Sequence, residues 1–430
     1  MTTAATPPPD APLRIAMLAY RGKPHVGGQG VYVREMSKAL TDLGHHVEVF
    51  GGPPYPDLDP RVELHRFPSL EIFNDHHPGR LPGFWEIKTI ADAAEVGSFM
   101  TGNFSEPLAF SIRAYQALKA RPGEFDMVID NGCLGYGDIA IQKRLGMPVL
   151  GVIHHPITVD RRLELGNSRG FIEKIGKRRW YAFTRMQTLV CQQIGRFVTV
   201  SESSKKDIST DHRVDIDKIH VVPIGIDTEF FAPQDHIERV PGRLVSTASA
   251  DVPLKGQRFL LEALAKVRAE YPEAHLELVG RNREGSTTSD TLAELGLADA
   301  VGFNHGISYE ALVELLASAT VAVVPSLYEG FSIPAIEALS CGAPLIATTG
   351  GALPEVAGPH RETSLAVPPG DSEALAEQIK YAFEHPAEME RIAAAGRQRV
   401  IEKWSWHESG LKTEAHCREL LSEFHTNGAR

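Results

Sequence analysis

The feature that most constrains this 430-residue chain is an alternation of short apolar runs with amphipathic helical segments, which occurs twice. A helical pattern over 31–44, ended by Gly44, separates the first two apolar runs of the first half. The apolar runs of this half lie at 13–20, 46–50, 125–130, 148–153 and 196–201. Runs of this length are typical of buried strands, and helices between them require crossover connections. The pattern therefore predicts a parallel sheet covered by helices.

The alternation stops at 223–242, a stretch with Pro and Gly and no sustained periodicity, and then starts again. Strands are expected at 242–249, 275–280, 300–304, 320–325 and 344–349, with a helix at 258–271. A chain of this length exceeds what one hydrophobic core usually holds.

We therefore predict an α/β protein with two Rossmann-like, doubly wound parallel-sheet domains, over 1–230 and 231–404. A last helix at about 405–430 can pack back on the first domain. Ligands of such sheets bind beyond the carboxyl ends of the strands, so the two domains are expected to face a central cleft.

Composition excludes several classes of function. The chain has 44 basic and 55 acidic residues and a net charge of −11, which argues against a nucleic-acid partner because such binding needs a basic surface. Four scattered cysteines form no Cys-x-x-Cys pair, so we expect neither a metal site nor a disulfide framework. The N-terminus lacks the pattern of a secretion signal, and no run of about 18 apolar residues is present. A cytoplasmic location is therefore expected.

The strongest candidate for a functional site is the segment Glu329-Gly-Phe-Ser-Ile-Pro-Ala-Ile-Glu337, which directly follows an expected buried strand. Pro334 suits the first turn of a helix, and Gly330 allows a sharp turn and close approach of a ligand. Backbone N–H groups near Ser332 would then point outward at a helix N-terminus, where they favour an anion. Glu337 is expected in the first helical turn and Glu329 in the loop. Two carboxylates beside a phosphate site suit sugar hydroxyls, and the alternative is a capping acid plus a solvated Glu.

This segment resembles the Glu-x7-Glu motif of retaining glycosyltransferases with the GT-B fold, in particular family 4 of that classification. Further similar segments occur in the same order along nearly the whole chain: GGQGVYVREMSKAL, IHH, VSESSKKDI, PIGIDTEFF, LKG and HLELVG. The resemblance implies a retaining hexosyltransferase that needs no metal and no cofactor beyond a UDP- or GDP-sugar donor. It implies transfer of a hexose, glucose or mannose, to a carbohydrate, polyol or lipid-linked acceptor with α-linkage.

The resemblance also assigns roles to residues that match the family motifs. Glu337 would hold the ribose hydroxyls of the donor, Glu329 would bind the donor sugar, and Lys255 would neutralise the diphosphate. The donor would also be contacted by Arg281, beside the base, and by the segment Gly330, Phe331, Ser332 and Ile333. The family commonly has an Arg a few residues ahead of the phosphate-binding Lys, but here the stretch reads Ala248-Ser-Ala-Asp251. Part of the diphosphate charge must therefore be met otherwise.

The resemblance implies roles for two further candidates in the N-terminal half. Gly27 and Gly28, between the first strand and helix, would present backbone amides to the donor phosphates, whereas the alternative is a tight turn. His154, at the end of the strand at 148–153, would orient the transferred sugar as a catalytic residue together with Glu329 and Lys255. A buried or capping His is the alternative, and His155 is a second candidate. The resemblance implies retention without a protein nucleophile, and the leaving phosphate oxygen can itself accept the proton of the acceptor hydroxyl.

Other functions stay open at this point. A nucleotide-sugar epimerase or a sugar-phosphate synthase of GT-B fold shares the donor site, and a non-catalytic nucleotide-sugar-binding protein shares the cleft. The segment 170–187, GFIEKIGKRRWYAFTRMQ, places basic residues beside aromatic ones. Such a helix can dock peripherally on an anionic membrane surface, on the cytoplasmic side. The alternative is a helix that packs its aromatic side inward and leaves its basic face in solvent.

Overall fold

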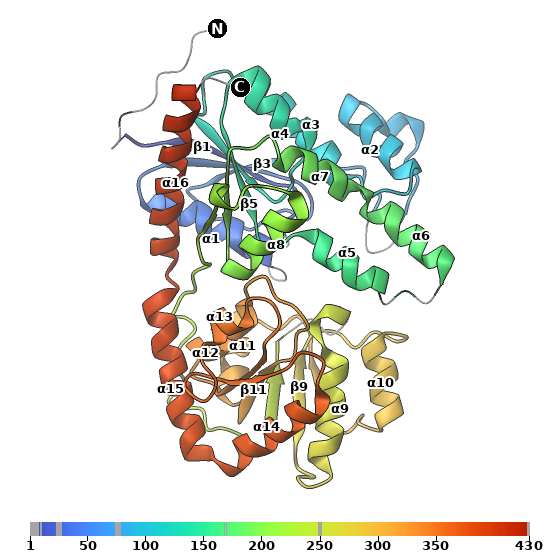
Figure 1. Ribbon diagram of the computed structural model, residues 1–430, viewed down its shortest axis with the longest axis vertical. Coiled ribbons are helices and arrows are strands. Elements are labelled where there is room, and N and C mark those ends of the chain that lie inside the picture. Colours follow the sequence, from blue (N-terminus) through green and yellow to red (C-terminus); the bar gives the residue numbers. More distant parts are fainter. Residues whose placement is uncertain are drawn as a thin grey trace. The chain divides into compact units, whose positions relative to one another are not determined.

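The computed structural model describes residues 8, 11–22, 28–73, 79–166, 168, 170–247 and 252–427. The chain forms two compact units (Figure 1). Unit 1 contains Met1–Val200, Ser204–Ile224 and Trp406–Arg430. Unit 2 contains Ser201–Ser203 and Gly225–Ser405, so the chain passes between the units within the aperiodic stretch at 223–242.

Unit 1 is built on a seven-stranded sheet in the order β3-β2-β1-β4-β5-β6-β7, in which every pair is parallel. Its strands are β1 (Arg14–Ala19), β2 (His46–Gly51), β3 (Glu63–Arg66), β4 (Met127–Asn131), β5 (Val149–Ile153), β6 (Arg196–Thr199) and β7 (Ile219–Val221). Five of these were expected from apolar runs. The edge strands β3 and β7 were not, because they are short and half-exposed and so lack an apolar run.

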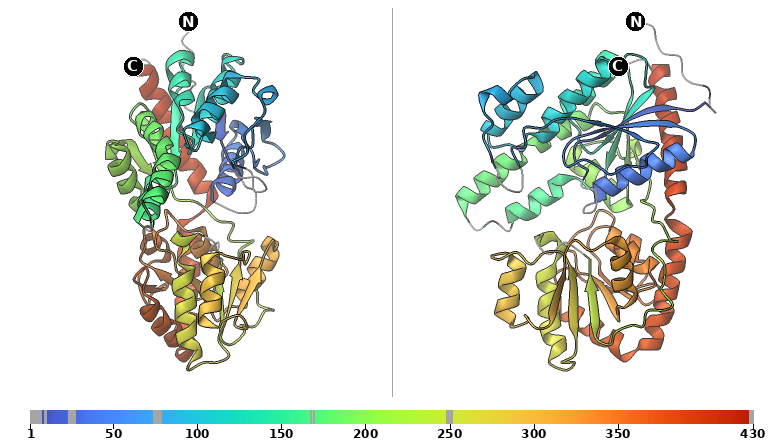
Figure 2. Two further views of the ribbon diagram at one scale, coloured as in Figure 1. Left: turned by 90° about the vertical axis from the view of Figure 1, so that its right-hand side faces the viewer. Right: turned by 180° about the vertical axis from the view of Figure 1, so that it is seen from behind.

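The helices of unit 1 cover both faces of this sheet (Figure 2). They are α1 (Gly28–Asp42), α2 (Ile90–Met100), α3 (Glu106–Lys119), α4 (Tyr136–Ala140), α5 (Ile157–Gly166), α6 (Phe171–Trp180), α7 (Thr184–Cys191), α8 (Glu202–His212) and α16 (Trp406–Asn427). Helix α1 begins at Gly28, three residues before the expected start at 31. The C-terminal helix α16 lies along α1, where Gly410 packs against Ala39 and Leu43 (Figure 1).

Unit 2 holds a six-stranded sheet in the order β10-β9-β8-β11-β12-β13, again parallel throughout. Its strands are β8 (Arg243–Ser246), β9 (His275–Val279), β10 (Val301–Asn304), β11 (Val321–Val324), β12 (Leu345–Thr348) and β13 (Leu365–Val367). Its helices are α9 (Gln257–Arg268), α10 (Thr287–Leu295), α11 (Tyr309–Ala317), α12 (Ile333–Ser340), α13 (Leu353–Ala357), α14 (Ser372–Glu384) and α15 (Pro386–Lys403).

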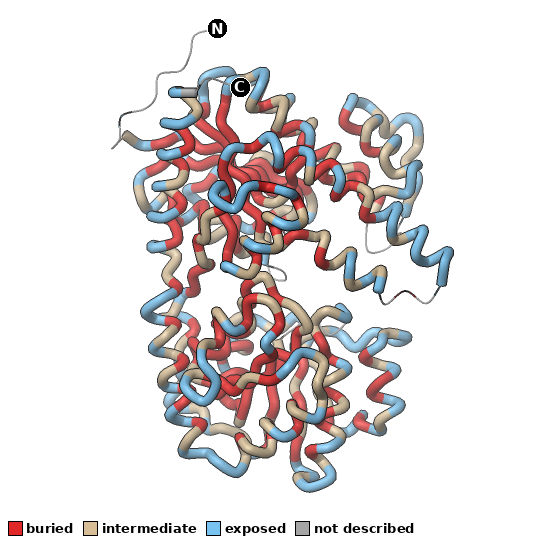
Figure 3. The backbone as a smooth tube through the Cα atoms, in the orientation of Figure 1, coloured by how far each residue is buried: buried red, intermediate tan, exposed pale blue. Residues whose placement is uncertain are grey.

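Each unit has a hydrophobic core of its own, centred on its sheet (Figure 3). Strands β4, β5, β6, β11 and β12 are buried along their whole length, as expected for parallel strands covered on both faces. In the described part of the chain, every helix is too short or too polar to cross a bilayer.

Strand order fixes where ligands can enter each unit. The order reverses between β1 and β4 in unit 1 and between β8 and β11 in unit 2. At such a switch point the connections leave in opposite directions, and the carboxyl ends of the two strands border a crevice. The loops after β1, β4, β8 and β11 are therefore the places to look for chemistry.

Candidate functional site

The loop between β11 and α12, together with α12 itself, contains the two glutamates of the predicted donor site: Glu329 lies in the loop and Glu337 in the helix. Pro334 lies in the first turn of α12, as predicted. Ser332 is the N-cap, and its Oγ accepts a hydrogen bond from the N–H of Ala335 at 3.4 Å. Its φ of 104° is uncommon for a residue with a side chain and indicates a constrained turn. The expected position of Glu337 was wrong: α12 begins at Ile333, so Glu337 lies in the second turn rather than the first.

Lys255 and Glu329, both predicted catalytic residues, form an ion pair in unit 2. The ammonium of Lys255 donates to both carboxylate oxygens of Glu329, at 2.7 and 2.9 Å. The hydroxyl of Ser326 donates to the same carboxylate at 2.6 Å. Ser326 is fully buried and Glu329 is buried, whereas the Lys255 side chain is 27% exposed. The pair therefore leaves part of the cation open to a ligand.

Backbone contacts hold the two halves of this pair together. The N–H of Leu327 donates to the carbonyl of Leu254 at 2.8 Å, which joins the loop after β11 to the loop after β8. Gly256 has a φ of +67°, and a Cβ there would lie 2.0 Å from the carbonyl oxygen of Pro325. Glycine is required at this position because the two backbones approach so closely. The loop that carries Lys255 is thereby fixed against the end of β11.

Glu337 is buried on α12, and burial raises the pKa of its carboxyl group to about 8. Within the described part of the chain, this carboxylate has no hydrogen-bond partner. A buried charge without a partner is costly, so the folded protein favours the protonated form. Ligand hydroxyl groups would supply the missing partners.

The remaining predicted donor contacts also lie in unit 2. Arg281 follows β9, is exposed, and donates from Nε to Nε2 of His305 at 2.5 Å. Phe331 is buried and packs edge-on against Trp404, with ring centroids 6.0 Å apart. The carbonyl of Gly330 accepts a hydrogen bond from the hydroxyl of Ser201 at 2.6 Å. Ile333, half-buried, is the first residue of α12.

In unit 1, His154 directly follows β5, and its Nε2 lies 2.8 Å from Oδ1 of Asn131, at the end of β4. The ring of Tyr32, on α1, meets the imidazole edge-on with centroids 4.6 Å apart. His155 instead pairs with Asp160, 2.9 Å away on α5. Gly28 is exposed at the first position of α1.

Two predicted features cannot be placed on the fold. Gly27 lies outside the described residues, as does the stretch from Ala248 to Asp251 that replaces the usual Arg.

Sequence reasoning missed Asn131 and Ser326. Asn131 is the last residue of β4, in the sequence IDN, and Ser326 follows β11, in the sequence VVPS. A polar residue at the carboxyl end of a buried parallel strand is the signal that could have identified both. Their roles depend on contacts with residues distant in sequence, which no local pattern shows.

Two other features of the fold do not belong to the predicted site. Among the described residues, Glu48, Glu63 and His65 are grouped closely enough to hold a metal ion, but the guanidinium of Arg121 already donates to Glu48 at 2.6 Å.

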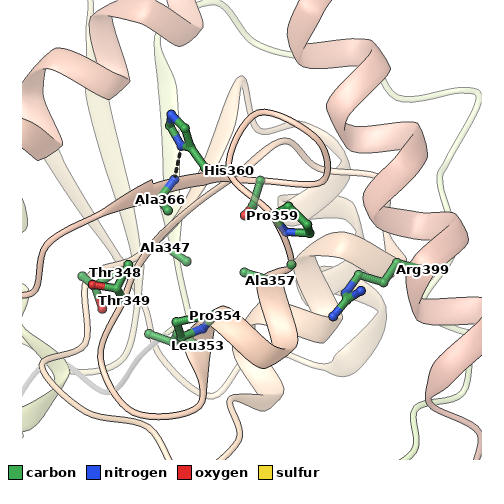
Figure 4. A pocket seen from close by; sticks show the side chains of 12 residues that line it. Ala347, Thr348, Thr349, Leu353, Pro354, Ala357, Pro359, His360, Ala366 and Arg399 are labelled. Atoms are coloured by element: carbon green, nitrogen blue, oxygen red, sulfur yellow. Dashed lines mark hydrogen bonds between the residues drawn. The ribbon is translucent and has the colours of Figure 1, made fainter.

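Unit 2 also has a cavity of about 390 Å³ beside α13 (Figure 4). Its lining is largely apolar and includes none of the predicted donor residues. Its Arg399 points to the end of α13, where it donates to the carbonyl of Glu355 at 2.6 Å.

Comparison with known proteins places this geometry in a family. The model for "Glycosyltransferase Family 4" matches residues 26–230, and the model for "Glycosyl transferases group 1" matches residues 232–399. The MMP α-(1→4)-mannosyltransferase of Mycolicibacterium hassiacum is 46% identical over 404 residues, covering 94% of this chain and 97% of that protein. The chain belongs to this glycosyltransferase family.

Proteins of lower sequence identity also resemble this glycosyltransferase, in sequence or in fold. The D-inositol 3-phosphate glycosyltransferase of Acidothermus cellulolyticus is 26% identical over 80% of this chain and 77% of that protein. The sucrose-phosphate synthase of Thermosynechococcus elongatus superposes with a TM-score of 0.73 at 21% identity, covering 95% of this chain and 99% of that chain. HepE of Anabaena, solved in complex with UDP, superposes with a TM-score of 0.68 at 16% identity, covering 95% of this chain and 100% of that chain. The fold is GT-B, and the protein is a hexosyltransferase that forms an α-linkage.

Proposed function

We propose that this glycosyltransferase is an α-(1→4)-mannosyltransferase that moves mannose from a nucleoside diphosphate onto a saccharide hydroxyl, with retention of configuration. The observation that carries the proposal is the 46% identity to the MMP α-(1→4)-mannosyltransferase along nearly the whole of both chains. The proposed mechanism uses no added metal or cofactor, because Lys255 and N–H groups are proposed to meet the charge of the diphosphate.

In the proposed mechanism the residues of unit 2 act mainly by charge and position. The Lys255 ammonium meets the negative charge that grows on the diphosphate as the glycosidic bond breaks, together with the N–H groups at the start of α12. Glu329 accepts hydrogen bonds from the sugar hydroxyls, and Glu337 from the ribose hydroxyls. The acceptor hydroxyl attacks on the face from which the phosphate departs, and that phosphate oxygen takes its proton. Holding both substrates in this arrangement supplies the rest of the rate.

The test is transfer by the purified protein from GDP-mannose, GDP-glucose, UDP-glucose and ADP-glucose to α-(1→4)-linked mannose oligosaccharides. We expect chain extension from the mannosyl donor alone, with a new α-(1→4) linkage by NMR. Glu329→Gln should lower transfer by about a hundredfold, whereas Glu294→Gln, an exposed position on α10, should not change it. Interconversion of free nucleotide sugars without an acceptor would point to an epimerase, and binding without turnover to a carbohydrate-binding protein. Either result would overturn the proposal.

We also propose that the N-terminal part of segment 170–187 contacts an anionic membrane peripherally. Helix α6 has no buried residue, and its Phe171 and Ile172 are 77% and 86% exposed. Lys174, Lys177 and Arg178 lie on the same helix, and apolar side chains beside cations favour an anionic interface. The later aromatic residues of the segment, Tyr181 and Phe183, are buried.

Cosedimentation with vesicles tests this contact. Binding should occur with phosphatidylglycerol vesicles, weaken with salt, and be lost in Phe171→Ser/Ile172→Ser. Equal binding to phosphatidylcholine vesicles, or none to either, would contradict it.

A further inference from the structure

Asn131 joins three elements of unit 1 at the switch point between β1 and β4. It ends β4, is 1% exposed, and faces both the first turn of α1 and the residue that follows β5. Its Nδ2 donates to the carbonyl of Gln29 at 3.5 Å, and its Oδ1 lies 2.8 Å from Nε2 of His154. A polar side chain so fully buried must satisfy its hydrogen bonds within the protein.

These contacts fix the orientation of the Asn131 amide. The opposite orientation would place Oδ1 against the carbonyl oxygen of Gln29, two acceptors facing each other, so Nδ2 must be the group on that side. An acceptor then faces His154, and only an N–H can approach it. His154 is therefore the tautomer with the proton on Nε2 and a lone pair on Nδ1.

The ring stays neutral in this environment. Burial, and to a smaller degree the neighbouring His155, lower the pKa of His154 to about 3. Its Nδ1 is buried and has no hydrogen-bond partner in the described part of the chain. The residue as a whole is half-buried. A neutral ring with one engaged donor and one unused acceptor is suited to a hydroxyl group.

We propose that Asn131 is a positioning residue: it holds His154 in the Nε2–H tautomer, so that Nδ1 accepts a hydrogen bond from a hydroxyl of the transferred hexose. The assignment of the hydroxyl rests on the proposed function, whereas the tautomer does not. Asn131 itself touches no substrate. Its side-chain oxygen acts only through the ring.

The tautomer can be measured without any substrate. In protein labelled with ¹⁵N at histidine, Nδ1 and Nε2 give distinct signals for a bonded proton and for a lone pair. Wild type should show His154 as Nε2–H, and Asn131→Ala should show a mixture of tautomers. Asn131→Asp keeps an acceptor oxygen and should keep Nε2–H. A wild-type signal from Nδ1–H would overturn the proposal whatever the enzyme transfers.

Transfer kinetics test the consequence for the reaction. Asn131→Ala should lower kcat/KM about tenfold, the loss expected for one hydrogen bond in the transition state. In a His154→Ala background the same substitution should have almost no effect, because there is no ring left to orient. An equal loss in both backgrounds would make Asn131 a structural residue and refute the proposal. Asn103→Ala, which removes an amide that donates to Ser98 elsewhere in unit 1, is the matched control and should leave kcat/KM unchanged.

The pH profile separates positioning from packing. In Asn131→Asp a carboxylate beside the ring raises the pKa of His154, and the protonated ring has no lone pair for a hydroxyl. At saturating donor, transfer by this variant should therefore decrease at acidic pH relative to wild type measured at the same pH. If the variant folds, by its melting temperature, and shows the wild-type profile, Nδ1 is not an acceptor for substrate and the proposal fails.

Discussion

The protonation state of Glu337 should couple donor binding to pH. Its carboxyl group is buried without a hydrogen-bond partner among the described residues, with the pKa raised to about 8. If ribose hydroxyls bind the ionised form, the apparent Kd exceeds its limiting value by a factor of one plus the ratio of protonated to ionised carboxyl. That factor is about 100 at pH 6 and about 2 at pH 8, so affinity should rise about 50-fold over this interval.

Calorimetric titration with a nucleotide sugar, in the absence of acceptor, measures both parts of this coupling. The diphosphate bridge of such a donor carries no titrating proton in this range, so the pH dependence belongs to the protein. Titrations at pH 6 in buffers of different ionisation enthalpy should show close to one proton released per donor bound. Glu337→Gln should bind more weakly and without pH dependence. An affinity of wild type that stays constant from pH 6 to pH 8, with no proton released, would refute the reasoning.

The same residue predicts the pH dependence of stability. The folded protein holds a proton on Glu337 that the unfolded chain releases near its ordinary pKa of 4.5. The contribution of this group to stability is therefore fully present below pH 4.5 and is lost as pH rises toward 8, by about 1.4 kcal/mol per unit. Urea unfolding of Glu337→Gln should lack this loss, and the variant should be the more stable protein at pH 8.

Three further changes probe other parts of the molecule. Lys255→Met should reduce transfer about a hundredfold but weaken binding of a nucleoside monophosphate far less, and equal losses would contradict a role at the diphosphate. If the loop amides contact the donor phosphates, as the family resemblance implies, Gly28→Val should spare nucleotide binding and lower transfer, because a branched side chain prevents close approach; normal transfer would make this loop only a turn. The rings of His220 and His416 stack with centroids 4.4 Å apart beside Arg196. Burial lowers the pKa of both imidazoles, and the positive charge of Arg196 lowers each further. Stability should therefore decrease as pH falls below the ordinary value of 6.5, and His416→Gln should unfold in urea with a weaker dependence between pH 5 and pH 7.

Much of the fold could be predicted from sequence because parallel strands buried on both faces are continuous apolar runs. The apolar runs at 125–130 and 344–349 correspond to β4 and β12, whose bounds differ from the predicted ones by one or two residues. Strand β3, with the sequence ELHR, carries no such signal, since its pairing with β2 comes from the backbone rather than from apolar side chains. The helix start at Gly28 was also missed, because glycine has little intrinsic helix preference.

The candidate site could be predicted as a set of residues but not as a set of contacts. The motifs identified Lys255 and Glu329, which are 74 residues apart in sequence. Their ion pair depends on β8 and β11 being neighbours at the switch point, and on Gly256 letting the two loops touch. The raised pKa of Glu337 could not be foreseen either, because it depends on the burial of the second turn of α12.

The pairing of Lys255 with Glu329 constrains how a donor can bind. The ammonium cannot give all its hydrogen bonds to a diphosphate while both carboxylate oxygens of Glu329 hold it at 2.7 and 2.9 Å. A phosphate that draws the ammonium away leaves the Glu329 carboxylate with the Ser326 hydroxyl and with room for sugar hydroxyls. If Lys255 binds the diphosphate and Glu329 the sugar, this exchange of partners would free the carboxylate for the sugar only when the phosphate is present, and would discriminate against free hexose. Ser326→Ala should then affect sugar donors more than the free nucleoside diphosphate, because among the described residues this hydroxyl is the donor left to the carboxylate once the lysine has moved. If both ligands lose affinity equally, the ion pair does not open on binding, and the exchange argument is wrong.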